Sequence, residues 1–267
     1  ALALDVTDQA QIDAAVAEDQ TFNGPTTQAV VAPEIQGTGW LRAKANGVLA
    51  GVDVAMAVFL RVDPALDVKP VLQDGAPLSP GDDIAVVRGS AAGILRAERI
   101  ALNFMQRMSG IASDTNRYVE AVKGLNARIV DTRKTVPGHR YLDKYSVRMG
   151  GGYNHRLNLA DGILIKDNHI QANAFREMGL KDVIQLALAR ASHTIKVEVE
   201  VETMDQVEVA LEAGAHIIML DNMSVPEMAD AMVVIGDQAI VEASGGITFD
   251  TVDRKSTRLN SSHVLIS

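Results

Sequence analysis

Residues 195–221, IKVEVEVETMDQVEVALEAGAHIIMLD, carry the pattern that decides the fold. A β-branched run at 195–201 is followed by a segment with helical spacing at 203–213 and by a second apolar run at 216–221. Strands that alternate with helices of this length pair in parallel, because each helix returns the chain to the same edge of the sheet. The stretch therefore predicts a β/α repeat.

The same alternation extends over the second half of the chain. Further β-branched runs lie at 128–132, 162–166 and 239–244, and helical spacing recurs near 174–192 and 225–235. Each expected strand ends in polar residues. The carboxyl ends of parallel strands in a barrel converge on one mouth, where active sites form, so we expect these polar side chains to meet.

The first part of the chain is organised differently. Residues 1–89 combine a helix-like start with short alternating segments and turn signals, which favours an α+β domain. From 91 to 123 apolar residues recur at every third or fourth position, which predicts one long helix.

Composition narrows the classes of function. The 267 residues include no cysteine, which excludes disulfides, thiolate metal sites and a cysteine nucleophile. No apolar run approaches the roughly 18 residues of a membrane span, and no signal peptide is recognisable, so we expect a cytoplasmic protein. The net charge is −9, yet residues 98–170 hold 12 Lys and Arg against 7 Asp and Glu. With 4% aromatic residues, this cationic segment suits a small anionic substrate better than a nucleic acid.

The basic candidates for a site follow strand ends or a run of three glycines. They are Thr132-Arg133-Lys134, His155-Arg156 after the glycines at 150–152, and Lys166. Guanidinium groups bind carboxylates and phosphates in bidentate fashion and keep their charge at any working pH. Any one of these cations could simply be solvated, but the whole set predicts a site for several carboxylate or phosphate groups.

Two carboxylates, Glu200 and Asp221, close apolar strands. Glu198, Glu200 and Glu202 alternate and share one face of their strand, and the strand length favours Glu200 as the residue at the mouth. Such carboxylates can hold ribose hydroxyls or a hydrated Mg²⁺, or can stabilise positive charge on a sugar. A structural salt bridge is the alternative interpretation.

A third motif, Ser244-Gly245-Gly246, follows the last expected strand. Two glycines and a hydroxyl before a helix offer backbone N–H groups to a phosphate, as at the usual phosphate position of α/β barrels. The motif is weak by itself, because Gly-Gly also occurs in ordinary turns.

Taken together, these motifs resemble the quinolinate phosphoribosyltransferase family over about residues 12–250, in the family's order. The segments that carry the resemblance are 98–104 (ERIALNF), 109–112 (SGIA), 132–138 (TRKTVPG), 150–156 (GGGYNHR), 164–169 (LIKDNH), 197–201 (VEVEV) and 220–222 (LDN).

The resemblance implies an N-terminal α/β sandwich domain at 1–99, an open α/β (TIM-like) barrel at 100–253 and a homodimer. It implies phosphoribosyl transfer from phosphoribosyl pyrophosphate to quinolinate with decarboxylation, in NAD biosynthesis, with Mg²⁺ held near Asp221 through water. Lys134, Glu200 and Asp221 would be catalytic. The carboxylates of quinolinate would be bound by Arg133, His155, Arg156 and an Arg99 donated by the partner subunit. Lys134 and Lys166 would contact phosphates, and Glu200 and Asp221 would contact the ribose. The 5′-phosphate would be bound by Ser244, Gly245 and Gly246.

The last residues depart from the family pattern. Residues 254–267, RKSTRLNSSHVLIS, are basic, rich in serine and without apolar periodicity. We interpret them as a non-native tail, so the expected barrel lacks its last strand; a disordered native tail is the alternative.

Two other functions stay open. ModD-type pyrophosphorylases share part of the pattern and would use another acceptor. A catalytically inactive fragment that only binds ligand is the second alternative. We expect no nucleic-acid or membrane partner.

Overall fold

The computed structural model describes residues 9–249, 251–252 and 264–267. The chain divides into two compact units. The first contains residues up to Asn116 together with Thr135–Gly151, and the second contains Arg117–Lys134 together with Gly152–Ser267. The predicted domain boundary at residue 99 lies inside α4 (Ala91–Ala121), the long helix expected from the sequence, which runs from the first unit into the second.

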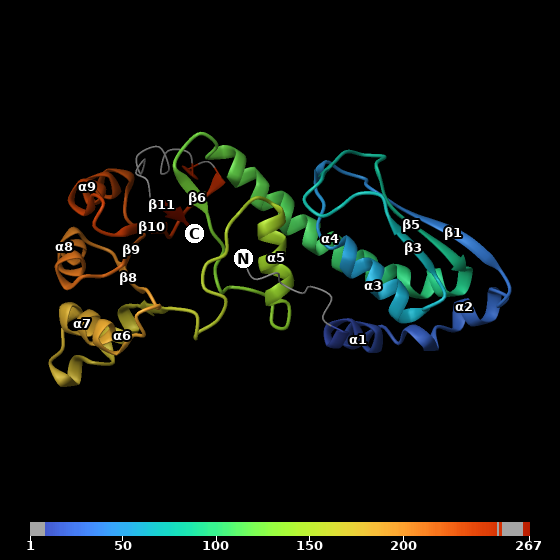
Figure 1. Ribbon diagram of the computed structural model, residues 1–267, viewed down its shortest axis with the longest axis horizontal. Helices are drawn as coiled ribbons and strands as arrows, with labels where there is room; N and C mark the ends of the chain where they lie inside the picture. Colours follow the sequence, from blue (N-terminus) through green and yellow to red (C-terminus); the bar gives the residue numbers. More distant parts are fainter. Residues whose placement is uncertain (1–8, 250, 253–263) are drawn as a thin grey trace. The chain divides into compact units, whose positions relative to one another are not determined.

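The first unit is an α+β structure around one antiparallel sheet in the order β1-β5-β3 (Figure 1). It also contains a small β2-β4 pair. Its strands are β1 (Gln36–Arg42), β2 (Gly47–Val48), β3 (Asp67–Pro70), β4 (Pro77–Leu78) and β5 (Asp83–Ser90). Its helices, besides the first part of α4, are α1 (Gln9–Glu18), α2 (Pro25–Val30), α3 (Val52–Val62) and α5 (Arg140–Met149), with a 3₁₀ turn at Thr21–Asn23.

Apolar helix faces form the core of the first unit. Helix α3 packs against α1 and β3, and Ile12 and Phe59 are 1% exposed. The start of α3 is capped by Asp74, whose carboxylate accepts the N–H groups of Gly51 and Val52 at 2.8 and 3.0 Å. This satisfies donors that the first helical turn otherwise leaves unpaired.

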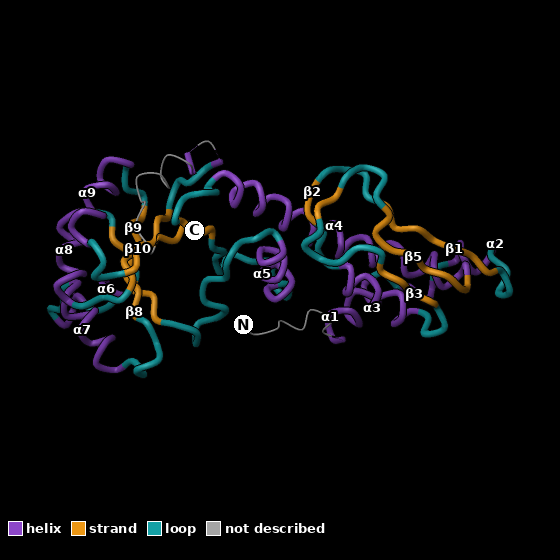
Figure 2. The backbone as a smooth tube through the Cα atoms, turned by 45° about the horizontal axis from the view of Figure 1, so that its top comes forward, coloured by secondary structure: helices purple, strands orange, loops and turns teal. Residues whose placement is uncertain are grey.

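The second unit is a parallel α/β structure with strand order β6-β11-β10-β9-β8-β7. Its strands are β6 (Ala127–Ile129), β7 (Ile163–Ile165), β8 (Val197–Val201), β9 (Ile217–Asp221), β10 (Ile240–Ser244) and β11 (Val264–Ile266). Its helices are α6 (Asp167–Gln171), α7 (Leu180–Arg190), α8 (Met204–Ala213) and α9 (Val225–Ile235), with a 3₁₀ turn at Ala174–Arg176. Figure 2 shows α7, α8 and α9 along the outer side of β8, β9 and β10.

Alternation along β8 explains how one strand serves both the core and the site. Val197, Val199 and Val201 are fully buried in the core shared with the helices. Successive side chains of a strand point to opposite faces, so Glu198 and Glu200 point to the barrel interior.

The α/β fold class is confirmed, and one detail of it differs from the prediction. The sheet does not lack a strand beside β10, because Val264–Ile266 forms β11 and pairs in parallel with both β10 and β6. The overall polar composition of 254–267 conceals the short apolar run VLI, and this run fills the position where two strand edges would otherwise be unpaired. Most of the predicted tail, residues 254–263, lies outside the described residues, and its non-native origin stays a prediction.

None of the helices in the described part of the chain is long and apolar enough to cross a membrane.

Candidate active site

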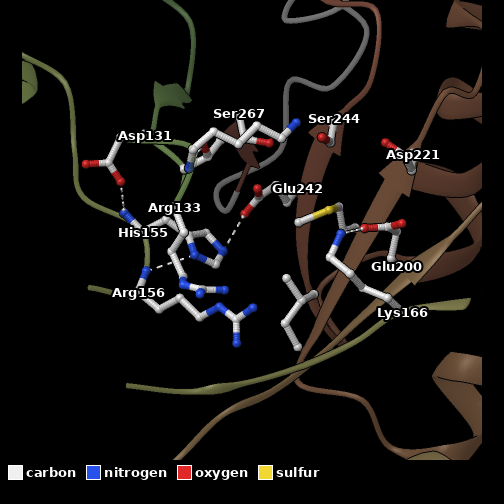
Figure 3. A pocket seen from close by; sticks show the side chains of 14 residues that line it. Asp131, Arg133, His155, Arg156, Lys166, Glu200, Asp221, Glu242, Ser244 and Ser267 are labelled. Atoms are coloured by element: carbon white, nitrogen blue, oxygen red, sulfur yellow. Dashed lines mark hydrogen bonds and ion pairs between the residues drawn. The ribbon is translucent and has the colours of Figure 1, made fainter. Parts of the chain in front are cut away.

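Polar residues at the carboxyl ends of the strands of the second unit surround one cavity of about 370 Å³ (Figure 3). Six strands or the segments that follow them contribute to it, as the β/α repeat predicts. The lining residues are Asp131, Thr132, Arg133, Lys134, His155, Arg156, Leu164, Lys166, Glu200, Met219, Asp221, Glu242, Ser244 and Ser267.

The structure brings together all the predicted site residues except Arg99, Gly245 and Gly246. Arg99 lies on α4 in the first unit, where it lines a separate cavity of about 730 Å³ with Trp40 and Arg42. Gly245 and Gly246 follow Ser244 at the end of β10, and both have positive φ, 77° and 60°.

One side of the cavity is formed by Arg133, His155 and Arg156. Burial, and then the nearby charge of Arg133, lower the pKa of Arg156, and the carboxylate of Glu198 partly opposes this. Among the described residues neither guanidinium forms an ion pair with a carboxylate. Two close and partly desolvated guanidiniums repel each other, so bound anions would relieve an existing electrostatic cost.

His155 lies between this side of the cavity and two buried acids. Its Nε2 is 3.0 Å from Oε2 of Glu198 and 3.4 Å from Oε2 of Glu242. The hydrogen bond to Glu198, and then the nearby carboxylate of Glu242, outweigh burial and raise the pKa of His155 to about 10. The backbone N–H of Arg156 donates to Nδ1 of His155 at 2.8 Å, and this contact disfavours protonation of Nδ1.

The opposite side of the cavity contains Lys166, Glu200 and Asp221. Lys166 Nζ donates to Oε2 of Glu200 in a short ion pair. The predicted alternative for Glu200, a salt bridge, is thus present, and it lies inside the cavity itself. The carboxylate of Asp221 accepts a hydrogen bond from Nδ2 of Asn222 at 2.7 Å.

The ends of β9 and β10 are held together beside this side. The N–H of Asn222 donates to the carbonyl of Ser244 at 3.1 Å. A Cβ atom on Gly245 would lie 2.3 Å from Oδ1 and 2.7 Å from the backbone nitrogen of Asn222. Glycine is therefore required at 245 by both its positive φ and this close approach.

The sequence interpretation missed a role for Glu242, Asp131 and Ser267. Asp131 Oδ1 accepts the backbone N–H of His155 at 2.9 Å, and its Oδ2 accepts Nδ2 of Asn154 at 2.6 Å. Glu242 precedes Ser244 by two positions, so strand alternation alone could have placed both on the inner face. Nothing in the polar tail indicated that Ser267 lines the cavity.

The fold and the site define an α/β-barrel enzyme with a cavity, lined by several cationic side chains, at the carboxyl ends of its strands. Comparison with known proteins then gives the family. Residues 25–109 match the quinolinate phosphoribosyl transferase N-terminal domain, and residues 111–260 match the C-terminal domain of the same family. The chain belongs to the quinolinate phosphoribosyltransferase family.

Individual relatives agree with this assignment. The chain is 41% identical over 221 residues to a probable nicotinate-nucleotide pyrophosphorylase [carboxylating] of Bacillus subtilis, covering 82% of this chain and 74% of the relative. It is 41% identical over 231 residues to the nicotinate-nucleotide pyrophosphorylase [carboxylating] of Mycobacterium leprae, covering 84% and 79%. The solved structure of NadC from Streptococcus pyogenes superimposes with a TM-score of 0.90 at 40% identity, covering 97% of this chain and 90% of that one.

Proposed function

We propose that the chain transfers the phosphoribosyl group of phosphoribosyl pyrophosphate to the ring nitrogen of quinolinate and decarboxylates the product to nicotinate mononucleotide. This makes it a pentosyltransferase. The observation that carries the proposal is the cavity itself, where cations converge from separate strand ends in a chain of this family. Two substrates that together bring several carboxylates and phosphates require such a concentration of positive charge.

Quinolinate would bind on the side of the cavity formed by Arg133, His155 and Arg156, the arginine side. Arg133 and Arg156 would each pair with carboxylate oxygens, and His155 would lie beside them. We further propose that Arg99 of a second subunit completes this side in a homodimer. Quinolinate binding on this side is supported by the position of Arg133 and Arg156, which line the cavity without forming an ion pair with a carboxylate among the described residues.

Phosphoribosyl pyrophosphate would bind on the opposite side. Lys134 and Lys166 would contact its phosphates, Glu200 and Asp221 its ribose, and the 5′-phosphate would lie at Ser244, Gly245 and Gly246. Binding exchanges the Lys166–Glu200 ion pair for two contacts with substrate. That exchange places an anion at the lysine and leaves Glu200 facing the sugar, where positive charge develops.

Mg²⁺ fits the donor set on this side. Asp221 offers carboxylate oxygens to the cavity, and the group that donates a hydrogen bond to it is the neutral amide of Asn222. Mg²⁺ is usually held by one or two carboxylates together with water and substrate phosphates. We propose that Asp221 holds it, through water, where the ion would neutralise charge on the departing pyrophosphate.

The chemistry requires no nucleophilic side chain. The bond between C1 of the ribose and pyrophosphate breaks as the pyridine nitrogen bonds to the same carbon. The ring nitrogen then carries positive charge and accepts the electron pair of the adjacent carbon–carboxylate bond, so CO₂ leaves and a proton takes its place. The residues of the cavity supply position and electrostatic stabilisation.

The test is formation of pyrophosphate and nicotinate mononucleotide from quinolinate, phosphoribosyl pyrophosphate and Mg²⁺. We expect turnover with quinolinate and none with acceptors that lack the two adjacent carboxylates. Turnover with another acceptor only would support the ModD-type alternative, and absence of all turnover by the folded chain would support an inactive ligand-binding protein. The cytoplasmic location expected from the sequence stays a prediction.

A further inference from the structure

Two buried glutamates of the barrel have no part in the proposed reaction. Glu198 on β8 and Glu242 on β10 are 4% and 1% exposed. Within the described structure, Oε1 of Glu198 and both carboxylate oxygens of Glu242 have no hydrogen-bond partner. Unsatisfied buried carboxylates destabilise a fold, so their presence beside a substrate cavity points to a function.

Both carboxylates approach the same atom, Nε2 of His155, at 3.0 Å for Glu198 and 3.4 Å for Glu242. Figure 3 shows the approach of Glu242 to His155. The N–H of Arg156 donates to Nδ1 of this ring. Nδ1 therefore acts as the acceptor, and the ring hydrogen is on Nε2; a second ring proton, on Nδ1, would break the contact with the N–H of Arg156. A ring in this state donates its Nε2 hydrogen to Glu198 and lies 3.4 Å from Glu242, and its Nε2 has no lone pair with which to bind a metal ion between the two acids.

His155 connects these acids to the segment that presents Arg156. The backbone N–H of His155 is held by Asp131 at 2.9 Å, and the ring itself accepts the N–H of the next residue. The His155 ring thus fixes the peptide between His155 and Arg156, and the acids fix the ring. Arg156 Nη1 is further held by the carbonyl of Gly162 at 3.3 Å.

We propose that Glu242, together with Glu198, is a positioning residue that holds the ring of His155 and, through it, places Arg156 for the carboxylates of the acceptor. The inference rests on the proposed function, because it assigns the acceptor to the arginine side. It predicts that substitution of Glu242 changes the binding of quinolinate and has little effect on the binding of phosphoribosyl pyrophosphate.

The experiment compares Glu242→Met, which keeps the side-chain length and removes the acceptor, with Glu242→Gln, which keeps an acceptor oxygen. We expect Glu242→Met to raise KM for quinolinate by roughly tenfold, the effect of removing one buried carboxylate that lies 3.4 Å from the ring. KM for phosphoribosyl pyrophosphate should change less than about twofold, and Glu242→Gln should show a smaller effect than Glu242→Met. Glu212→Gln is the control, because Glu212 is an exposed partner of Lys181 outside the cavity.

Two further measurements separate positioning from a general structural role. In a double-mutant cycle with His155→Asn, the effects on KM for quinolinate should be far from additive. In ¹⁵N-labelled wild-type protein the Nε2–H of His155 should exchange slowly and give a resolved signal, which is lost in His155→Asn and shifted in both Glu242 variants.

Equal rises in both KM values, or additive effects in the cycle, would overturn the proposal, as would a stoichiometric metal ion that is lost from Glu242→Met. If Glu242→Met does not fold, Glu198→Gln and Glu242→Gln are each combined with His155→Asn in the same double-mutant cycle. If the wild-type chain shows no turnover, the proposed function fails first. The proton signal of His155 and its dependence on Glu242 still decide whether the acids hold the ring.

Discussion

The two sides of the cavity solve the problem of concentrated charge in different ways. On one side Arg133 and Arg156 lie close together, and among the described residues neither pairs with a carboxylate. On the other side Lys166 is already paired with Glu200. The arginine side is therefore arranged for an anion before one arrives, whereas the lysine side must exchange an internal ion pair for contacts with substrate.

The difference indicates how binding free energy contributes on each side of the cavity. Anions on the arginine side reduce repulsion between guanidiniums, so binding there contributes directly to affinity. On the lysine side the free energy gained from new contacts with substrate is offset by loss of the Lys166–Glu200 ion pair. Contacts that strengthen only as charge develops in the transition state therefore contribute most to catalysis there. We expect arginine substitutions to weaken acceptor binding and substitutions of the ion pair to affect mainly the chemical step.

The largest effect should follow Arg133→Ala. Loss of a bidentate charge-assisted contact should lower kcat/KM for quinolinate by about 100-fold or more. Arg133→Lys should restore only part of the activity, because an ammonium group cannot form the planar two-bond contact. Steady-state kinetics with each substrate varied would check this, and full activity in Arg133→Lys would argue for a simple point charge.

The next largest effect concerns the glycines beside the lysine side. Gly245→Ala introduces a Cβ atom 2.3 Å from Oδ1 of Asn222 at a φ of +77°, and should lower the free energy of unfolding by about 2 kcal/mol. Gly246→Ala is the matched variant, since its φ of +60° is similar and nothing lies within 4 Å of the new atom. Its cost should be about 1 kcal/mol. Urea unfolding of both would check the difference, and equal costs would mean that contact with Asn222 is unimportant.

A smaller effect is expected for the ion pair itself. Lys166→Met and Glu200→Gln should each lower kcat by about tenfold, with less change in KM for phosphoribosyl pyrophosphate, and the double variant should lose less than the product of the two. The reason is that removal of one partner leaves the other without its counter-charge. Strictly additive losses would show that the two residues act independently.

The smallest effect is a dependence of stability on pH. The raised pKa of His155, about 10, means that its ion pairs contribute fully below about pH 6.5 and are lost as pH rises toward 10. The free energy of unfolding of the wild type should therefore fall more steeply over this range than that of His155→Asn. The difference should stay below the limit of about 1.4 kcal/mol per pH unit for one proton, because a second ring proton breaks the contact between Nδ1 and the N–H of Arg156. His193→Asn, at an exposed position, should keep the wild-type slope.

Much of the fold and site followed from local pattern. The alternation of valine and glutamate in 197–201 indicated a strand with one face in the core, and the polar residues at strand ends indicated where Lys166, Asp221 and Ser244 would meet. These predictions succeeded because strand period and parallel pairing fix the direction of each side chain.

Other features depended on contacts between distant segments. Glu242 was overlooked because its significance comes from His155, 87 positions away in the chain, and no local pattern records that approach. Strand β11 was missed because three apolar residues have no periodicity of their own and become a strand only between two existing ones. The role of Arg99 needs a second subunit and stays a prediction.

Strand β11 has a consequence for local unfolding. It joins β10 to β6 through three residues, and its last carbonyl accepts the N–H of Val130, the residue before Asp131. The next amide, that of Ser267, donates to Ala243, the residue before Ser244. So short a strand should open at a lower free energy than its neighbours, and its opening would release the backbone next to two cavity residues at once. Amide hydrogen exchange at Val130 and Ser267 should therefore occur together, faster than in β8 and β9, and slow when the cavity is filled.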